Sequence, residues 1–230
     1  AMYAGADFIK TNICVSSTYD LKNPYKQEMT DDEIKHVCDE ANMLNLKVAS
    51  HTSGGQGITT AVKYGIHSVE HGHWLDNETI DLMAKNNTFY VPTLLVNERN
   101  FDFETDEIFK KSKNWEWLEL SREAKWISLE KAIKANINIA VGTDAGFMLP
   151  HGSMNYREIE YLVQGGMSNM QAIKSATRIG GKLLQMNVGT IQIGQKADLL
   201  VVNGNPIEDI KVLSDKNNIK VFKDGELITN

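Results

Sequence analysis

Short apolar, β-branched runs alternate along most of this chain with longer segments of helical periodicity. Five runs predict strands: Phe8–Cys14, Lys47–His51, His67–His71, Thr88–Leu95 and Ile137–Thr143. Thr30 and Glu33 have the spacing of a helix capping box, and apolar residues follow them at helical spacing. Further helices are expected through Ala61 and Tyr64, and at Asn77–Asn86, Trp115–Ala135, Asn155–Gly165 and Ser168–Leu184. Repeated strand–helix units predict an α/β fold with a parallel sheet covered by helices.

The pattern changes after about Met186. Glycines interrupt Gly189–Lys196, and Asp224 and Gly225 are typical of a tight hairpin turn. Short strands are expected at Ala197–Val202, Lys220–Lys223 and Glu226–Ile228. We therefore expect a main portion of residues 1–186 and a small C-terminal β-sandwich portion of residues 187–230.

Five predicted strands are too few to close an eight-stranded (β/α)8 barrel. We expect a partial TIM barrel, with strands equivalent to strands 4–8 and with the N-terminal part of the fold absent from this sequence. An open half-barrel leaves strand edges and one sheet face uncovered. The expected partner is another copy of the chain or the missing N-terminal segment.

Composition excludes several classes of protein. The 230 residues carry a net charge of −6 and no basic run, which argues against a nucleic-acid partner. No apolar stretch approaches the roughly 18 residues of a membrane span, and the N-terminus does not resemble a signal peptide. Two cysteines do not make a disulfide framework, so a reducing, cytoplasmic location is expected.

Metal-capable side chains end three of the predicted strands: His51, His71 and Asp144. Lys10 lies inside a fourth strand-like run. The C-terminal ends of parallel barrel strands converge on one mouth, so these four side chains predict a metal site and hydrolysis by metal-activated water. His67 and His73 flank His71 and leave the choice of ligand open. His73 has the same strand parity as His71 and could enter the mouth.

The motifs, in their order, resemble the amidohydrolase superfamily, in its prolidase-like and imidazolonepropionase-related branch. The matching segments are GADFIK (Gly5–Lys10), VASHTSG (Val48–Gly54), SVEHG (Ser68–Gly72), VGTDAG (Val141–Gly146), HGSMNYRE (His151–Glu158) and the tail Gly189–Ile210. The resemblance implies cleavage of a C–N bond in a small amide, dipeptide-like or cyclic amide substrate. It also implies one or two divalent ions, with zinc as the default for nitrogen and oxygen ligands.

The same resemblance implies roles for single residues. Lys10 would react with carbon dioxide to give a carbamate that bridges two metal ions, since a free ammonium has no lone pair to offer. His51 and His71 would bind the second metal, and the VEHG pattern selects His71. Asp144 would bind the first metal and act as general base. His73 and His151 are substrate-side candidates.

One departure from the family keeps two alternatives open. The His-x-His pair that the family uses for the first metal has no counterpart here in a first-strand context. One alternative is a catalytically incomplete fragment. The other is an imidazolonepropionase-like mononuclear enzyme, and Lys10 argues against it.

Residues 97–114, with Phe101, Phe103 and Phe109, are predicted to form a specificity loop or lid, or else a disordered insertion.

Overall fold

A computed structural model describes residues 5–16, 22–23, 25–102, 107–146, 149–152 and 154–229. The chain divides into two compact units, residues 1–139 and residues 140–230, and each is described by itself. This division follows the contacts within the chain, and the predicted boundary near residue 186 remains a prediction.

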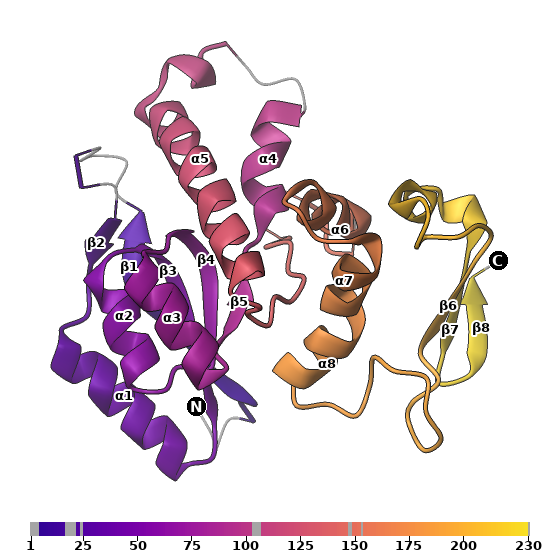
Figure 1. The fold of residues 1–230 in the computed structure, drawn as a ribbon, viewed down its shortest axis with the longest axis horizontal. Helices are drawn as coiled ribbons and strands as arrows, with labels where there is room; N and C mark the ends of the chain where they lie inside the picture. Colours follow the sequence, from indigo (N-terminus) through magenta and orange to yellow (C-terminus); the bar gives the residue numbers. More distant parts are fainter. Residues whose placement is uncertain are drawn as a thin grey trace. The chain divides into compact units, whose positions relative to one another are not determined.

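The first unit is built on a five-stranded sheet with the order β2–β1–β3–β4–β5 (Figure 1). Its strands are β1 (Phe8–Ser16), β2 (Tyr25–Gln27), β3 (Lys47–Gly54), β4 (Ser68–Trp74) and β5 (Phe89–Val91). β1, β3, β4 and β5 run parallel, whereas β2 pairs antiparallel with β1 at the edge. The predicted α/β fold with a parallel sheet is confirmed. β2 has no counterpart among the predicted strands, because its three residues contain no apolar run.

Three helices lie over one face of this sheet: α1 (Asp31–Met43), α2 (Gln56–Lys63) and α3 (Asn77–Asn86) (Figure 1). Along β3 and β4 the side chains alternate, with Val48, Ser50 and Val69 buried and with His51 and Glu70 partly exposed on the other face. The predicted capping box of α1 is present. The Thr30 hydroxyl accepts from the Glu33 amide at 3.3 Å, and the Glu33 carboxylate accepts from the Thr30 amide at 2.8 Å.

The segment predicted as a loop or lid is mostly helical where the structure describes it. α4 (Leu94–Asp102) and α5 (Lys113–Lys134) lie side by side, and a short 3-10 turn (Phe109–Lys111) precedes α5 (Figure 1). Phe101 packs on Trp115 with ring centroids 4.9 Å apart, and the buried Glu98 carboxylate is paired with Arg122. These contacts between α4 and α5 order the segment, so the loop prediction is wrong for these residues. Phe103 lies outside the described residues.

Two predicted strands are shorter than expected. Pro92 ends β5, and α4 begins two residues later, so the predicted strand Thr88–Leu95 shrinks to three residues. The predicted strand Ile137–Thr143 is reduced, among the described residues, to one parallel bridge between Ile139 and Tyr90. The Tyr90 amide also donates to the Asn138 carbonyl at 2.9 Å. This segment therefore follows β5 without forming a ladder.

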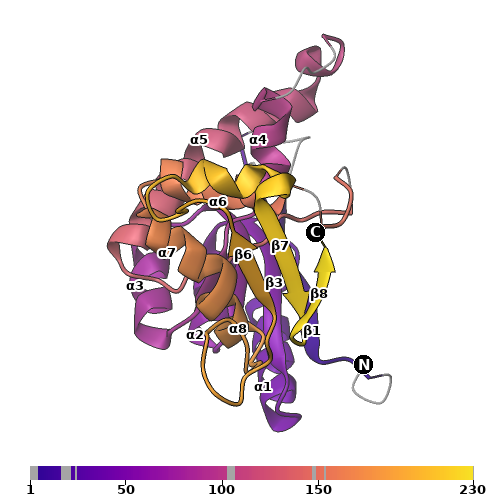
Figure 2. The same ribbon diagram turned by 90° about the vertical axis from the view of Figure 1, so that its right-hand side faces the viewer.

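The second unit combines a helical stretch with a small antiparallel sheet. Its helices are α6 (Asn155–Gln164), α7 (Asn169–Lys174), a π-helical turn (Ser175–Ile179) and α8 (Gly180–Leu183), with 3-10 turns at Ile210–Ser214 and Lys216–Asn218. Its sheet has the order β6 (Leu199–Val202), β7 (Ile219–Lys223) and β8 (Glu226–Thr229) (Figure 2). Asp224 and Gly225 both have positive φ, as the predicted hairpin turn requires. Among the described residues, no helix is both long and apolar enough to cross a bilayer.

Candidate metal centre

Strand register places Lys10, His51 and Glu70 on one face of the parallel sheet. Ala49 of β3 stands opposite Lys10 of β1, and His51 stands opposite Glu70 of β4. Residues two apart on a strand share a face, and so do neighbours across a parallel ladder. The buried side chains of Val48 and Val69 point to the opposite face of the sheet.

Glu70 joins this group although its chemistry was not singled out in the sequence. Its carboxylate lies 3.5 Å from the Lys10 ammonium and accepts a hydrogen bond from the Ser68 hydroxyl at 2.6 Å. The signal was available, because Ser68 and Glu70 are two apart in a predicted strand and therefore share a face. The Lys10 side chain is 46% exposed, so this ion pair is partly screened by water.

The imidazoles of His51 and His71 lie edge to face, with ring centroids 4.4 Å apart. His71 is buried, and its Nδ1 is 2.7 Å from the Thr93 hydroxyl oxygen. Burial lowers the pKa of His71 well below its usual range. The charge of Lys125 acts in the same direction, and His51 and Lys10 contribute less strongly. His71 is therefore neutral at physiological pH, which is the form of imidazole that binds metals.

A bulge in β4 sets the direction of the His71 side chain. Thr52 pairs with His71, but Gly54 pairs with Trp74, so β4 contains one more residue than β3 across this interval. His71 and Gly72 both lie in the left-handed region, with φ of 71° and 50°. The Tyr90 hydroxyl lies 3.1 Å from the carbonyl oxygen of His71 and 3.0 Å from that of Gly72, in reach of both. A Cβ on Gly72 would lie 2.9 Å from the Tyr90 ring, so only glycine fits.

The bulge lies between His71 and Trp74, so the alternation of side chains does not by itself place His73. The His73 ring nevertheless stacks beside that of His71, with centroids 6.2 Å apart, and packs edge-on against Trp117 at 5.1 Å. His73 is buried, and burial, followed by the charge of Lys125, lowers its pKa well below the usual range. The Asn97 side chain acts weakly in the opposite direction. His73 thus occupies an aromatic environment next to His71.

Asp144 and His151 belong to the second unit. Asp144 is exposed and has a left-handed backbone with φ of 54°. The following turn closes with a hydrogen bond from the Gly146 amide to the Leu149 carbonyl at 2.8 Å. A Cβ on Gly146 would lie 2.7 Å from the His151 ring, so this ring packs directly on the turn that carries Asp144. The proximity of His151 to Asp144 along the chain is thus reinforced by packing.

The structure brings together the predicted ligands of the first unit, as the imidazoles of His51 and His71 with their ring centroids 4.4 Å apart and Lys10 on the same face of the sheet as His51. Within the described part of the chain, no three His, Cys, Asp or Glu side chains gather closely enough to hold a metal ion. The donor chemistry still suits a divalent ion such as zinc. One ring nitrogen of His71 is engaged by Thr93, which is the arrangement that orients a metal-binding imidazole.

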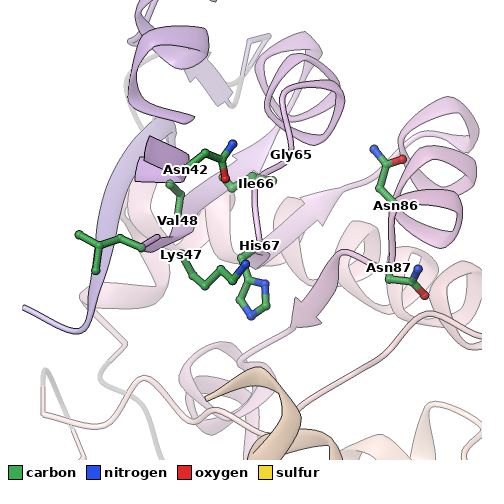
Figure 3. A pocket seen from close by; sticks show the side chains of 9 residues that line it. Asn42, Lys47, Val48, Gly65, Ile66, His67, Asn86 and Asn87 are labelled. Atoms are coloured by element: carbon green, nitrogen blue, oxygen red, sulfur yellow. The ribbon is translucent and has the colours of Figure 1, made fainter. Parts of the chain in front are cut away.

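A pocket of about 180 Å³ lies at the other end of the same strands (Figure 3). Lys47, Val48 and His67 line it, and these residues stand at or just before the starts of β3 and β4. Asn42 and Asn86 also border it. His51 and His71 each follow about four residues later on the same strands. The pocket and the candidate metal centre therefore lie at opposite ends of β3 and β4.

A family model described as the amidohydrolase family matches residues 4–228. The chain belongs to the amidohydrolase family. This amidohydrolase is 31% identical to ochratoxinase from Aspergillus niger over 210 residues, which are 89% of this chain and 42% of that protein. A crystal structure of the A. niger ochratoxinase superimposes with a TM-score of 0.86 at 29% identity, and the match covers 52% of it.

Two further solved structures resemble this amidohydrolase over its whole length. One is a Xaa-Pro dipeptidase with methionine bound in the active site, at a TM-score of 0.84 and 36% identity, of which 56% is covered. The other is a putative prolidase from Bifidobacterium longum, at a TM-score of 0.87 and 26% identity, of which 57% is covered. The chain therefore spans about half the length of the relatives that it matches.

Proposed function

We propose that this amidohydrolase carries part of the active site of a metal-dependent hydrolase that cleaves a C–N bond in a small amide, dipeptide-like or cyclic amide substrate. The observation that carries the proposal is the pair of imidazoles, His51 and His71, 4.4 Å apart on neighbouring parallel strands. The similarity to an ochratoxinase and to a Xaa-Pro dipeptidase supports hydrolysis as the reaction type.

The strands are proposed to be part of a (β/α)8 barrel, in which β1, β3, β4, β5 and the segment at Ile139 correspond to strands 4–8. Consecutive parallel pairing from β1 to β5, continued by the bridge at Ile139, supports this assignment. In such a barrel the C-terminal strand ends, with His51 and His71, face the mouth where substrate binds.

His51 and His71 are proposed to hold one divalent ion and Asp144 another, with zinc as the default, and Lys10 to add a ligand as a carbamate formed with carbon dioxide. A bound divalent ion would supply Lewis-acid activation of the substrate carbonyl and of water. Carbamylation replaces the positive charge of Lys10 by a negative charge. Glu70 lies 3.5 Å from Lys10, so carbamylation would replace an ion pair by two like charges that repel each other.

The proton transfer is assigned to Asp144. Its exposed carboxylate accepts a proton from the attacking water and passes it to the leaving nitrogen, so that the amine departs neutral. His151 packs on the turn that follows Asp144, and the buried His73 stacks beside His71. Both are proposed to lie on the substrate side of the site.

Zinc stoichiometry, measured beside hydrolysis of dipeptides and N-acyl amino acids, tests this proposal. We expect Lys10→Ala to lose zinc and most of its turnover, and added short carboxylates to restore part of both by replacing the carbamate. Lys47→Ala is the matched control, because Lys47 lines the pocket at the other strand end. Full metal content and rate in Lys10→Ala would exclude the carbamate. A wild-type protein with zinc but no turnover would favour the catalytically incomplete alternative.

A further inference from the structure

A network of buried polar groups connects α5 to His71. Lys125 of α5 is 1% exposed, and its ammonium donates to the Thr93 carbonyl at 3.2 Å and to the Asn97 side-chain oxygen at 2.7 Å. The Asn97 amide in turn donates to the Ser121 hydroxyl at 3.3 Å. A lysine is rarely buried so completely, and a backbone carbonyl and an amide oxygen are among its acceptors here.

Thr93 stands at the centre of this network in a conformation that a β-branched residue rarely adopts. Its φ is 50°, in the left-handed region. Such strain persists only where surrounding contacts fix it, and it gathers at functional sites. Lys125 holds the Thr93 carbonyl, while the Thr93 hydroxyl reaches both the Pro92 carbonyl and His71 Nδ1 at 2.7 Å.

The hydroxyl of Thr93 has one proton to donate, and this decides the tautomer of His71. The Pro92 carbonyl can only accept a hydrogen bond, so the hydroxyl donates to it. The same hydroxyl then accepts from His71, which places the imidazole proton on Nδ1. The lone pair of His71 is consequently on Nε2, where a metal can use it.

We propose that Thr93, clamped by Lys125, is the positioning residue that fixes His71 as the Nδ1–H tautomer and leaves Nε2 for a metal ion. This inference rests on the proposed function for the metal, but the tautomer is a property of the metal-free protein. Lys125 and Thr93 act through His71 and take no part in the chemistry. A role in packing alone would stabilise α4 and α5 without deciding where the His71 proton lies.

The test is long-range proton–nitrogen NMR of the metal-free protein at neutral pH, with the His71 signal assigned by its loss in His71→Gln. We expect Nδ1–H in the wild type and in Thr93→Ser, which keeps the hydroxyl. Thr93→Val, which keeps the shape but loses the hydroxyl, should populate Nε2–H and bind zinc about 10–100-fold more weakly. Lys125→Met should shift the tautomer and weaken zinc binding in the same direction.

Lys131→Met is the matched control on the same helix, because Lys131 donates to the Leu75 carbonyl at 3.1 Å and not to Thr93. It should leave the His71 tautomer unchanged. An Nε2–H tautomer in the wild type, or an unchanged tautomer in Thr93→Val, would overturn the inference. An unchanged tautomer in Lys125→Met alone would overturn the part assigned to Lys125. A wild-type protein that binds no zinc would instead overturn the metal proposal, and the tautomers would still decide the role of Thr93.

Discussion

Asp144 carries its carboxylate on a left-handed backbone, a region that asparagine also adopts readily. Asp144→Asn should therefore keep the local fold and one oxygen for a metal, but it cannot accept a proton from water. We expect turnover to fall about 10²–10⁴-fold, the usual contribution of general-base catalysis. Metal content measured beside turnover checks this expectation.

Asp224→Asn is the control for that substitution, since Asp224 also has a left-handed backbone and lies in the hairpin turn between β7 and β8. It should change neither turnover nor metal content. If Asp144→Asn keeps both its metal and its rate, Asp144 is only a turn residue.

At the residue scale, the sequence identified His51 and His71 because each stands at the end of a short predicted strand. It could not indicate the left-handed φ of His71, because the presence of a histidine does not predict a bulge. It also could not indicate that Thr93, 22 residues away, engages the ring. Such contacts depend on packing between elements distant in the chain, which local periodicity does not encode.

At the element scale, the capping box of α1 offers a pH-dependent prediction. The Thr30 amide and, second, the Thr30 hydroxyl donate to Glu33 and lower its pKa below the usual range of a glutamate. A lowered pKa in the folded state stabilises the protein above the unfolded value, and this stabilisation is lost as the pH falls through the folded value. Thr30→Ala should raise the pKa of Glu33 part of the way back, because the backbone hydrogen bond remains.

NMR titration of Glu33 measures that shift, and urea unfolding at neutral pH should show a loss of about 0.5–2 kcal/mol for the missing cap. Thr30→Ser keeps the oxygen and should leave both quantities near their wild-type values. An unchanged Glu33 pKa in Thr30→Ala would show that the hydroxyl contributes nothing to it.

The helices show why the sequence predicts some elements correctly and misses others. α1 and α5 combine a cap at Thr30 or Ser112 with a long run of good helix formers, so local rules suffice. α4 has polar residues at buried positions, Asn97 and Glu98, and their partners stand on α5. Without knowledge of those partners the segment looks like a polar loop, which is why the loop prediction is wrong for the described residues.

At the scale of the whole molecule, the exposed apolar side chains predict association of the 230-residue chain. The sheet of the second unit presents Leu200, Val201 and Ile228, each more than half exposed. Exposed apolar strands are sites of pairing with another copy or another segment. We expect light scattering to show concentration-dependent oligomers.

Leu200→Lys should weaken that association, whereas Ile207→Lys should not, because Ile207 is equally exposed but lies outside the strands. A monomer with one cooperative unfolding transition at all concentrations would contradict the prediction.

The bulge at Gly72 has a consequence for how this protein tolerates variation. Every side chain larger than hydrogen at position 72 meets the ring of Tyr90, and Tyr90 holds the backbone that aims His71. In a saturation mutagenesis library selected for activity, substitutions at Gly72 and Tyr90 would therefore be lost as strongly as substitutions at the histidines. Two residues with no part in the proposed chemistry would score as though they were catalytic, because the selection also reports how the His71 side chain is directed.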